Sequence, residues 1–128
     1  MKRGEIYFID IPKDENDKHK QWGYRPCVII SNDMNNKYCS RVQYIPMTSQ
    51  QGKTKLPTHI TLKSTRMQKD TIALCECIDA IDKSYVKEKV GRVSEEDLIG
   101  IEMGMLIQLY PQNKLSFMIN NLRQVSYA

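Results

Sequence analysis

The apolar positions in the first three quarters of the 128-residue chain form short runs that are separated by turn residues. Runs of this length and spacing predict the strands of a compact, mostly antiparallel β-barrel or sandwich. The runs cover residues 4–11, 25–32, 41–49, 58–64 and 71–81. Turn-forming residues lie between them at 12–17, 32–36 and 50–53. The connection over residues 11–24 is longer than a hairpin needs, and loops of that length often carry function.

After Gly91 the pattern becomes helical. Ser94 is a good N-cap, acidic residues follow it, and apolar residues recur at three- and four-residue intervals until Pro111 ends the helix. Gly100 and Gly104 lie on one side of this helix, where each lowers helix propensity by about 1 kcal/mol relative to Ala. Either the helix approaches the barrel or a second subunit closely there, or the glycines are simply tolerated.

The chain is expected to form one domain over residues 1–111, with an extension over residues 112–128 that packs on the same domain and includes a second short helix. Hydrophobic residues make up 41% and charged residues 27%, which is typical of a globular protein and not of a disordered one. No run approaches the roughly 18 apolar residues of a membrane span, and no apolar signal segment follows the basic N-terminal residues. We therefore expect a cytoplasmic protein without a membrane partner. Its net charge of +4 permits an anionic binding partner.

The four cysteines do not form a zinc pattern, because no CxxC pair occurs and the two histidines lie far apart. The sequence therefore predicts no metal site. Cysteines in a cytoplasm stay reduced, and three of these lie inside apolar runs, where they behave as small hydrophobic residues. We expect Cys27, Cys75 and Cys77 in the core and Cys39 in an exposed loop.

Polar residues at two strand ends are candidates for binding an anion. In the stretch GYRPCVIISND, residues 23–33, Arg25 precedes Pro26, which favours an extended strand start at the rim of the sheet. A guanidinium at a rim can bind phosphate. Thr48 and Ser49 end the third run, and a hydroxyl there either donates to an anion or stabilises a turn.

Three further residues are candidates with open alternatives. Glu76 lies between two cysteines, so strand alternation places its side chain on the opposite face, toward solvent or a cleft. His19 lies in the long loop, where it is either solvated or available for proton transfer near neutral pH. Trp22 either stacks on a base or packs the loop against the barrel.

Several motifs occur together in a characteristic order: GEIYFIDI, GYRPCVIISND, IPMTS, LPTHITL, IDKSYV and GRVSEEDLIGIE. From about Met1 to Leu109 the chain thereby resembles the MazF/PemK (Kid) family of toxin endoribonucleases. The resemblance implies a mainly β (α+β) fold, an SH3-like, CcdB-type small barrel of antiparallel strands with a C-terminal helix, and a homodimer. It also implies cleavage of single-stranded RNA at short sequences without metal or cofactor, and inhibition by a cognate antitoxin. Internal attack of the 2′-hydroxyl would leave a 2′,3′-cyclic phosphate and a 5′-hydroxyl.

The resemblance also implies roles for particular residues. The family's catalytic Arg falls on Arg25 and its Thr on Thr48, and these would bind the scissile phosphate and stabilise its charge. A loop His of some members falls on His19 and a fifth-strand acidic residue on Glu76. We assign Glu76 as the base that takes the 2′-proton and His19 as the acid that protonates the leaving oxygen.

RNA contacts are expected at a further set of residues, which comprises Trp22, Ser49, Lys53, Lys55, Cys77 and Asp79. Cys77 and Asp79 stand where many members have Gln and Arg. Because an Arg to Asp change reverses a charge beside the RNA, the recognised sequence should differ or the binding should weaken. Two other classes, a CcdB-type gyrase poison and a non-catalytic SH3-like nucleic-acid-binding module, would not require both Arg25 and Thr48.

Overall fold

A computed structural model of the chain describes residues 1–49, 56–63, 71–110, 114, 117 and 120–121. In chain order the elements are β1 (Glu5–Ile11), β2 (Gly23–Ile29), α1 (Asp33–Tyr38), β3 (Arg41–Thr48), β4 (His59–Leu62), β5 (Thr71–Leu74), η1 (Cys75–Cys77), β6 (Asp79–Asp82), η2 (Lys83–Tyr85), β7 (Val86–Arg92) and α2 (Glu95–Leu109). The elements η1 and η2 are single turns of 3₁₀ helix.

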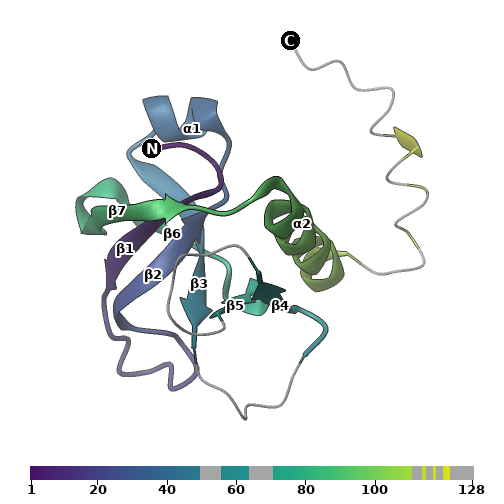
Figure 1. The fold of residues 1–128 in the computed structure, drawn as a ribbon. Helices are drawn as coiled ribbons and strands as arrows, with labels where there is room; N and C mark the ends of the chain where they lie inside the picture. Colours follow the sequence, from purple (N-terminus) through teal and green to yellow (C-terminus); the bar gives the residue numbers. More distant parts are fainter. Residues whose placement is uncertain (50–55, 64–70, 111–113, 115–116, 118–119, 122–128) are drawn as a thin grey trace.

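Within the described residues the strands form one seven-stranded sheet with the order β4-β5-β3-β2-β1-β7, and β6 pairs with β3 beside this path. The strand pairs are antiparallel. Helix α2 lies against the β4 and β5 end of the sheet, whereas α1 lies at the opposite end from the long β1–β2 loop (Figure 1). The prediction of a mainly antiparallel β fold with a C-terminal helix is confirmed.

Both faces of the central strands are buried, which explains why their sequences read as continuous apolar runs. Alternation along β2 sends Val28 into a core cluster that also contains Leu98 and Ile101 of α2. Cys27 and Ile29 point into a second cluster on the other face. The two clusters hold the central strands in a fixed register, so the polar residues at the strand ends are fixed too.

Helix α2 begins and packs as its sequence predicts. The Ser94 side chain accepts a hydrogen bond from the backbone N–H of Asp97 at 3.1 Å, which satisfies a donor of the first turn. A Cβ at Gly104 would lie 2.7 Å from Cys75 Sγ and 3.0 Å from Ile60 Cγ1. The glycines of α2 therefore allow a close approach to η1 and β4, one of the two expected explanations. In the described part of the chain, no helix combines the length and the apolar character that crossing a membrane requires.

Two elements differ from the sequence-based expectation at the other end of the sheet. The segment expected as a turn at residues 32–36 begins α1, because the Asn32 side chain accepts a hydrogen bond from the Asn35 N–H at 2.8 Å and caps a six-residue helix. Strand β7 was not indicated by an apolar run, since most of its residues are exposed. It pairs with β1 at the end of the described sheet.

The prediction of a single strand over residues 71–81 is wrong, because this segment is divided into β5, η1 and β6. Strand β3 pairs with β6 through residues 41–44 and with β5 through residues 47–48. Pro46 lies where the partner changes, and a proline has no N–H to donate to a ladder. The chain opposite it therefore leaves the sheet as a turn, and Glu76 lies in that turn instead of following strand alternation. Cys77 is correspondingly half-buried, whereas Cys27 and Cys75 are buried and Cys39 is exposed, as expected.

The C-terminal extension lies almost entirely outside the described residues, which include only positions 114, 117, 120 and 121 beyond Tyr110. The second helix and the packing of residues 112–128 on the domain stay predictions.

Candidate active site

Two cavities lie beside the β1–β2 loop and strand β3. The smaller cavity has a volume of about 400 Å³. It is lined by Trp22, Tyr24, Arg25, Pro26, Met47, Thr48, Ser49 and Thr71. The structure thus brings the candidates Arg25, Thr48, Ser49 and Trp22 together.

Local backbone structure positions Arg25 in the smaller cavity. Gly23 has a φ of +91°, a backbone conformation that other residues rarely adopt, and this lets the long loop turn into β2. Arg25 Nε then donates a hydrogen bond to the Trp22 carbonyl at 2.7 Å, and this bond fixes the side chain near the loop. Among the described residues no carboxylate forms an ion pair with Arg25. Its guanidinium is therefore anchored through Nε while its charge stays available to an external anion.

Two hydroxyls and two aromatic rings surround Arg25 in this cavity. Thr48 is buried at the end of β3, and Ser49 is exposed just beyond it. Trp22 and Tyr24 are about half exposed, at 50% and 51%, so Trp22 is not buried against the barrel. Besides the two hydroxyls, the cavity therefore offers a cation and exposed aromatic rings, the features that proteins combine to bind single-stranded nucleic acids.

Tyr24 is a candidate that sequence reasoning missed. Its ring stacks on Phe8 with centroids 4.8 Å apart and planes 10° from parallel. The stack supports one face of Tyr24 and leaves half of its surface open beside Arg25. An aromatic residue directly before the Arg-Pro pair was the available signal.

The larger cavity has a volume of about 620 Å³. The remaining described candidates lie here, namely His19, Glu76, Cys77 and Asp79. Its lining also includes Asp17, Lys20, Gln21, Tyr44, Pro46, Leu56, His59, Leu74 and Ile78. The structure therefore separates the expected acid and base from Arg25 and Thr48, which line the smaller cavity.

Hydrogen bonds fix the Glu76 carboxylate at the wall of the larger cavity. Thr58 Oγ1 donates to Glu76 Oε1 at 3.1 Å, and His59 Nε2 lies 2.6 Å from Glu76 Oε2. His59 is the more buried partner, with 8% of its side chain exposed against 24% for Glu76. Sequence reasoning did not identify His59 as a site residue, although it is part of the motif Leu-Pro-Thr-His.

The Leu-Pro-Thr-His motif builds this arrangement through a turn. The His59 N–H donates to the Leu56 carbonyl at 2.9 Å, and Pro57 occupies the second position, where its fixed φ suits a turn. The Leu56 N–H in turn donates to His59 Nδ1 at 3.3 Å. Nδ1 is thus the acceptor, so the ring hydrogen is on Nε2 and points at Glu76.

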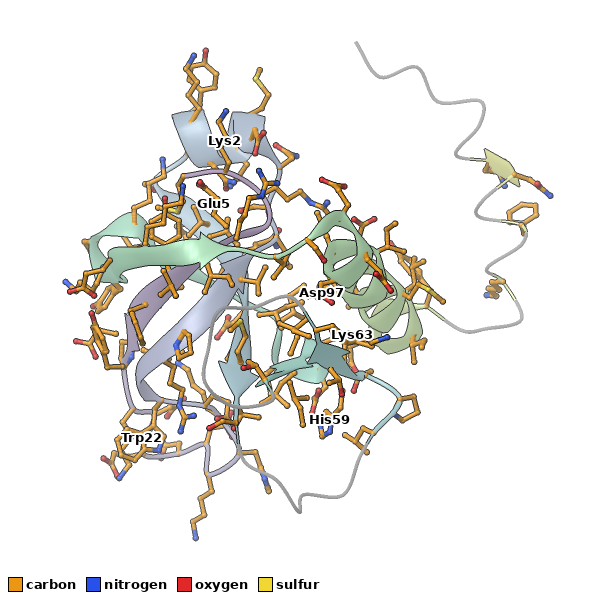
Figure 2. All side chains as sticks on the ribbon, in the orientation of Figure 1. Lys2, Glu5, Trp22, His59, Lys63 and Asp97 are labelled. Carbon is orange, nitrogen blue, oxygen red and sulfur yellow. The ribbon has the colours of Figure 1, made fainter. Side chains whose placement is uncertain are left out.

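The two cavities are neighbours along the same two segments. In the loop, Gln21 lines the larger cavity and the next residue, Trp22, lines the smaller one. In β3, Pro46 lines the larger cavity and the next residue, Met47, lines the smaller one. Trp22 and His59 lie at the same end of the molecule, away from Lys2 and Glu5 (Figure 2). The same loop and the same strand therefore contribute to the walls of both cavities.

The two buried thiols near the cavities, those of Cys27 and Cys75, are poor nucleophiles. Burial raises the pKa of Cys27, beside Arg25 in β2, to about 12. Burial, followed by the charge of Glu76, raises the pKa of Cys75 to about 12 as well. Since the thiolate is the reactive form, neither side chain supports covalent catalysis.

In the part of the chain that the structure describes, no three His, Cys, Asp or Glu side chains come together in a way that could hold a metal ion. The predicted RNA contacts Lys53 and Lys55 lie outside the described residues.

The fold is shared with several solved structures. MazF from Deinococcus radiodurans superposes with a TM-score of 0.73 at 20% sequence identity, covering 85% of this chain and 96% of that one. An endoribonuclease from a Mycobacterial species gives a TM-score of 0.68 at 18% identity, covering 87% of this chain and 93% of that one. A Mycobacterial endoribonuclease in complex with its cognate antitoxin gives 0.67 at 19% identity, with coverages of 85% and 94%.

A family comparison agrees with these superpositions and extends over most of the chain. Residues 2–109 match the family described as PemK-like, MazF-like toxin of type II toxin-antitoxin system. The matched segment contains the whole described sheet, both cavities and α2. By this match the chain belongs to the PemK-like, MazF-like toxins of type II toxin-antitoxin systems.

Proposed function

We propose that this toxin is an endoribonuclease that cuts single-stranded RNA in the cytoplasm without a metal, and that the scissile phosphate binds in the smaller cavity. The observation that carries this proposal is the Arg25 guanidinium, anchored through Nε and lacking a described carboxylate partner, beside the Thr48 hydroxyl. A planar fork of N–H donors matches two phosphate oxygens at once.

The chemistry follows from what these groups can stabilise. The RNA 2′-oxygen attacks the adjacent phosphorus, a P–O bond forms to it, and the bond from phosphorus to the 5′-oxygen breaks. Negative charge accumulates on the non-bridging oxygens, where Arg25 and Thr48 donate hydrogen bonds that strengthen as the charge develops. The products are a 2′,3′-cyclic phosphate and a 5′-hydroxyl, and the 2′-proton passes to a base while an acid protonates the 5′-oxygen.

Glu76 and His19 line the neighbouring cavity, so they serve this step only if the reacting nucleotide spans both cavities. Their assignment as base and acid stays a prediction. The pH dependence of cleavage by Glu76→Gln and His19→Gln tests this assignment, because loss of a general base or acid removes one limb of the bell-shaped pH–rate profile. Unchanged limbs in both variants would refute the assignment.

We further propose that the toxin forms a homodimer and that a cognate antitoxin inhibits it. The antitoxin proposal is supported by the Mycobacterial endoribonuclease and Deinococcus MazF structures that were solved as antitoxin complexes. Light scattering tests the dimer, with an expected mass about twice the 14.9 kDa of the chain.

Cleavage of a long single-stranded RNA in EDTA, with mapped 5′ ends, tests the enzyme and its site. Wild-type protein should give discrete cuts, and Arg25→Ala or Thr48→Val should lower the rate by about 10² or more, the usual loss when one transition-state donor is removed. Arg25→Lys keeps the charge but loses the fork and should recover only part of the rate. Arg92→Ala, an exposed arginine in β7, is the matched control.

Two results would contradict the proposal. Cleavage that is equally fast in the Arg25 and Thr48 variants would place the chemistry elsewhere. A pure wild-type protein that cuts no RNA would favour a binding module.

A further inference from the structure

The larger cavity contains an acceptor whose position is fixed before any ligand arrives. Among the described residues, Thr58 donates a hydrogen bond to one oxygen of Glu76 and His59 donates one to the other. An ionised carboxylate has about four lone-pair sites, so each oxygen can accept one more hydrogen bond. Because 24% of the side chain is exposed to the cavity, those sites are accessible to a ligand.

The charges of the larger cavity exclude phosphate and favour a donor. Three carboxylates, those of Asp17, Glu76 and Asp79, line it against one ammonium group, that of Lys20. A nucleotide entering here has its phosphate repelled toward Arg25, which lines the adjacent smaller cavity. The cavity volume of about 620 Å³ lies within the usual range for small-ligand sites, so it can hold a nucleobase.

Of the four RNA bases, guanine best matches a carboxylate with one acceptor site left on each oxygen. Its Watson–Crick edge carries the N1–H and an N2–H side by side and parallel, as the N–H groups of an arginine fork are. Adenine and cytosine each offer one amino group on that edge, and uracil offers one imide N–H. Recognition of single-stranded RNA commonly uses such unpaired edges.

We propose that the larger cavity is a guanine-selecting subsite for the RNA that is cut in the smaller cavity. Glu76 receives the guanine N1–H and N2–H, and since these bonds occupy its remaining acceptor sites, it does so instead of acting as the general base. His59 is a positioning residue, whose Nε2–H holds the carboxylate in the required orientation. This inference rests on the proposed endoribonuclease function, which it refines by naming a preferred base.

Nucleoside binding tests the subsite independently of cleavage. In an NMR titration of the whole protein, guanosine should shift the His59 ring resonances and bind about tenfold or more tightly than adenosine, cytidine or uridine. Inosine, which lacks only the N2 amino group, should lose most of that preference. Glu76→Gln should abolish the preference for guanosine. Glu88→Gln, which neutralises an exposed carboxylate in β7, should leave this preference intact.

An arginine side chain of a protein partner is the other donor that would fit this carboxylate. The same titration with N-acetyl-arginine amide therefore has a deciding outcome. If this probe shifts the His59 ring and guanosine does not, the subsite belongs to a protein partner and our inference is wrong. Equal affinity for the four nucleosides would also overturn it.

Mapping the cut sites separates this inference from the proposed function. Arg25→Ala should slow cutting at every site by about 10² or more, whereas the cuts that Glu76→Gln still makes, at whatever rate, should have lost a guanine preference of about tenfold at one position beside the cut. His59→Ala should relax the same position, and His59→Gln, which still presents an N–H donor, should restore part of the preference. Base preference in Glu76→Gln identical to wild type would overturn the inference even if Arg25 proves essential.

Discussion

At the scale of single residues, Tyr24 should contribute to binding without contributing to chemistry. Its ring is supported by Phe8 and half exposed beside Arg25, so an unpaired base can stack on the open face. Because stacking on an aromatic ring is worth about 1–3 kcal/mol per base, Tyr24→Ala should raise the Kd for single-stranded RNA by roughly 5- to 150-fold. Fluorescence anisotropy with a labelled oligonucleotide measures this.

The control variants for Tyr24 follow from its surroundings. Tyr24→Phe keeps the ring and should bind as wild type does. Tyr38→Ala removes an even more exposed ring from α1, at the opposite end of the molecule, and should have no effect. Equal binding by Tyr24→Ala and wild type would exclude a stacking role.

Glu5 in β1 predicts an acid-dependent loss of stability. Burial acts to raise the pKa of Glu5, but hydrogen bonds from Lys89 and the Lys2 N–H outweigh it and hold the pKa below its ordinary value of 4.5. A depressed carboxylate pKa stabilises the fold above 4.5, and this contribution disappears as the pH falls through the lowered value.

Glu5→Gln should therefore be less stable than wild type near neutral pH, and the difference should shrink below pH 4.5. Urea unfolding at a series of pH values measures it. Glu88→Gln, which neutralises an exposed carboxylate in β7, should not show this dependence. A difference between Glu5→Gln and wild type that stays constant with pH would contradict the explanation.

At the scale of elements, the contact between α2 and η1 depends on the absence of a side chain at Gly104. A Cβ there would lie 2.7 Å from the Sγ of Cys75, which is fully buried and has little room to move. Gly104→Ala should therefore lower the free energy of unfolding by about 1–3 kcal/mol, although alanine is the better helix former by about 1 kcal/mol.

Thermal or urea unfolding tests Gly104→Ala against two matched variants. At Gly100 the nearest atom is Ile60 Cγ2 at 3.1 Å, so Gly100→Ala should be less harmful. At Gly91 a Cβ would meet no atom within 4 Å, and Gly91→Ala should change stability by about 0.5 kcal/mol or less. A Gly104→Ala variant that is as stable as wild type would show that α2 can move away from η1.

The elements that the sequence predicts well are those whose signal is local. Strands β1 to β3 carry runs that are buried on both faces, and α2 carries its own cap and periodicity. The break at η1 could not be read from residues 71–81, because its cause lies in Pro46 on the neighbouring strand. An exposed edge strand such as β7 contains few buried apolar residues, so its sequence shows no apolar run that would predict a strand.

The same distinction applies to the candidate site. Arg25 and Thr48 were predictable from strand ends and from the family motifs, and they line one cavity. The pairing of His59 with Glu76 joins residues that are 17 positions apart through a turn and a broken strand. Neither residue alone signals that contact.

At the scale of the whole molecule, RNA binding should depend on salt, because a chain of net charge +4 binds a polyanion partly by releasing counterions. For single strands, log Kobs falls with log salt concentration with a slope of about −0.7 per phosphate contact. Arg25→Ala should make the slope less negative by about 0.7, whereas Glu76→Gln should leave it unchanged because that carboxylate contacts no phosphate. Binding titrations at several salt concentrations measure both slopes, and an unchanged slope in Arg25→Ala would contradict a phosphate contact.

The division of the binding surface into two cavities has a consequence for how such toxins diversify. The groups proposed to bind the scissile phosphate and those proposed to select a base come from the same loop and neighbouring strands but line different cavities. If these proposals hold, substitutions at positions such as Cys77 and Asp79 alter which transcripts are cut while Arg25 and Thr48 are inherited unchanged. A lineage can acquire new targets in single mutational steps, and a protein engineer can use the same route to retarget the enzyme.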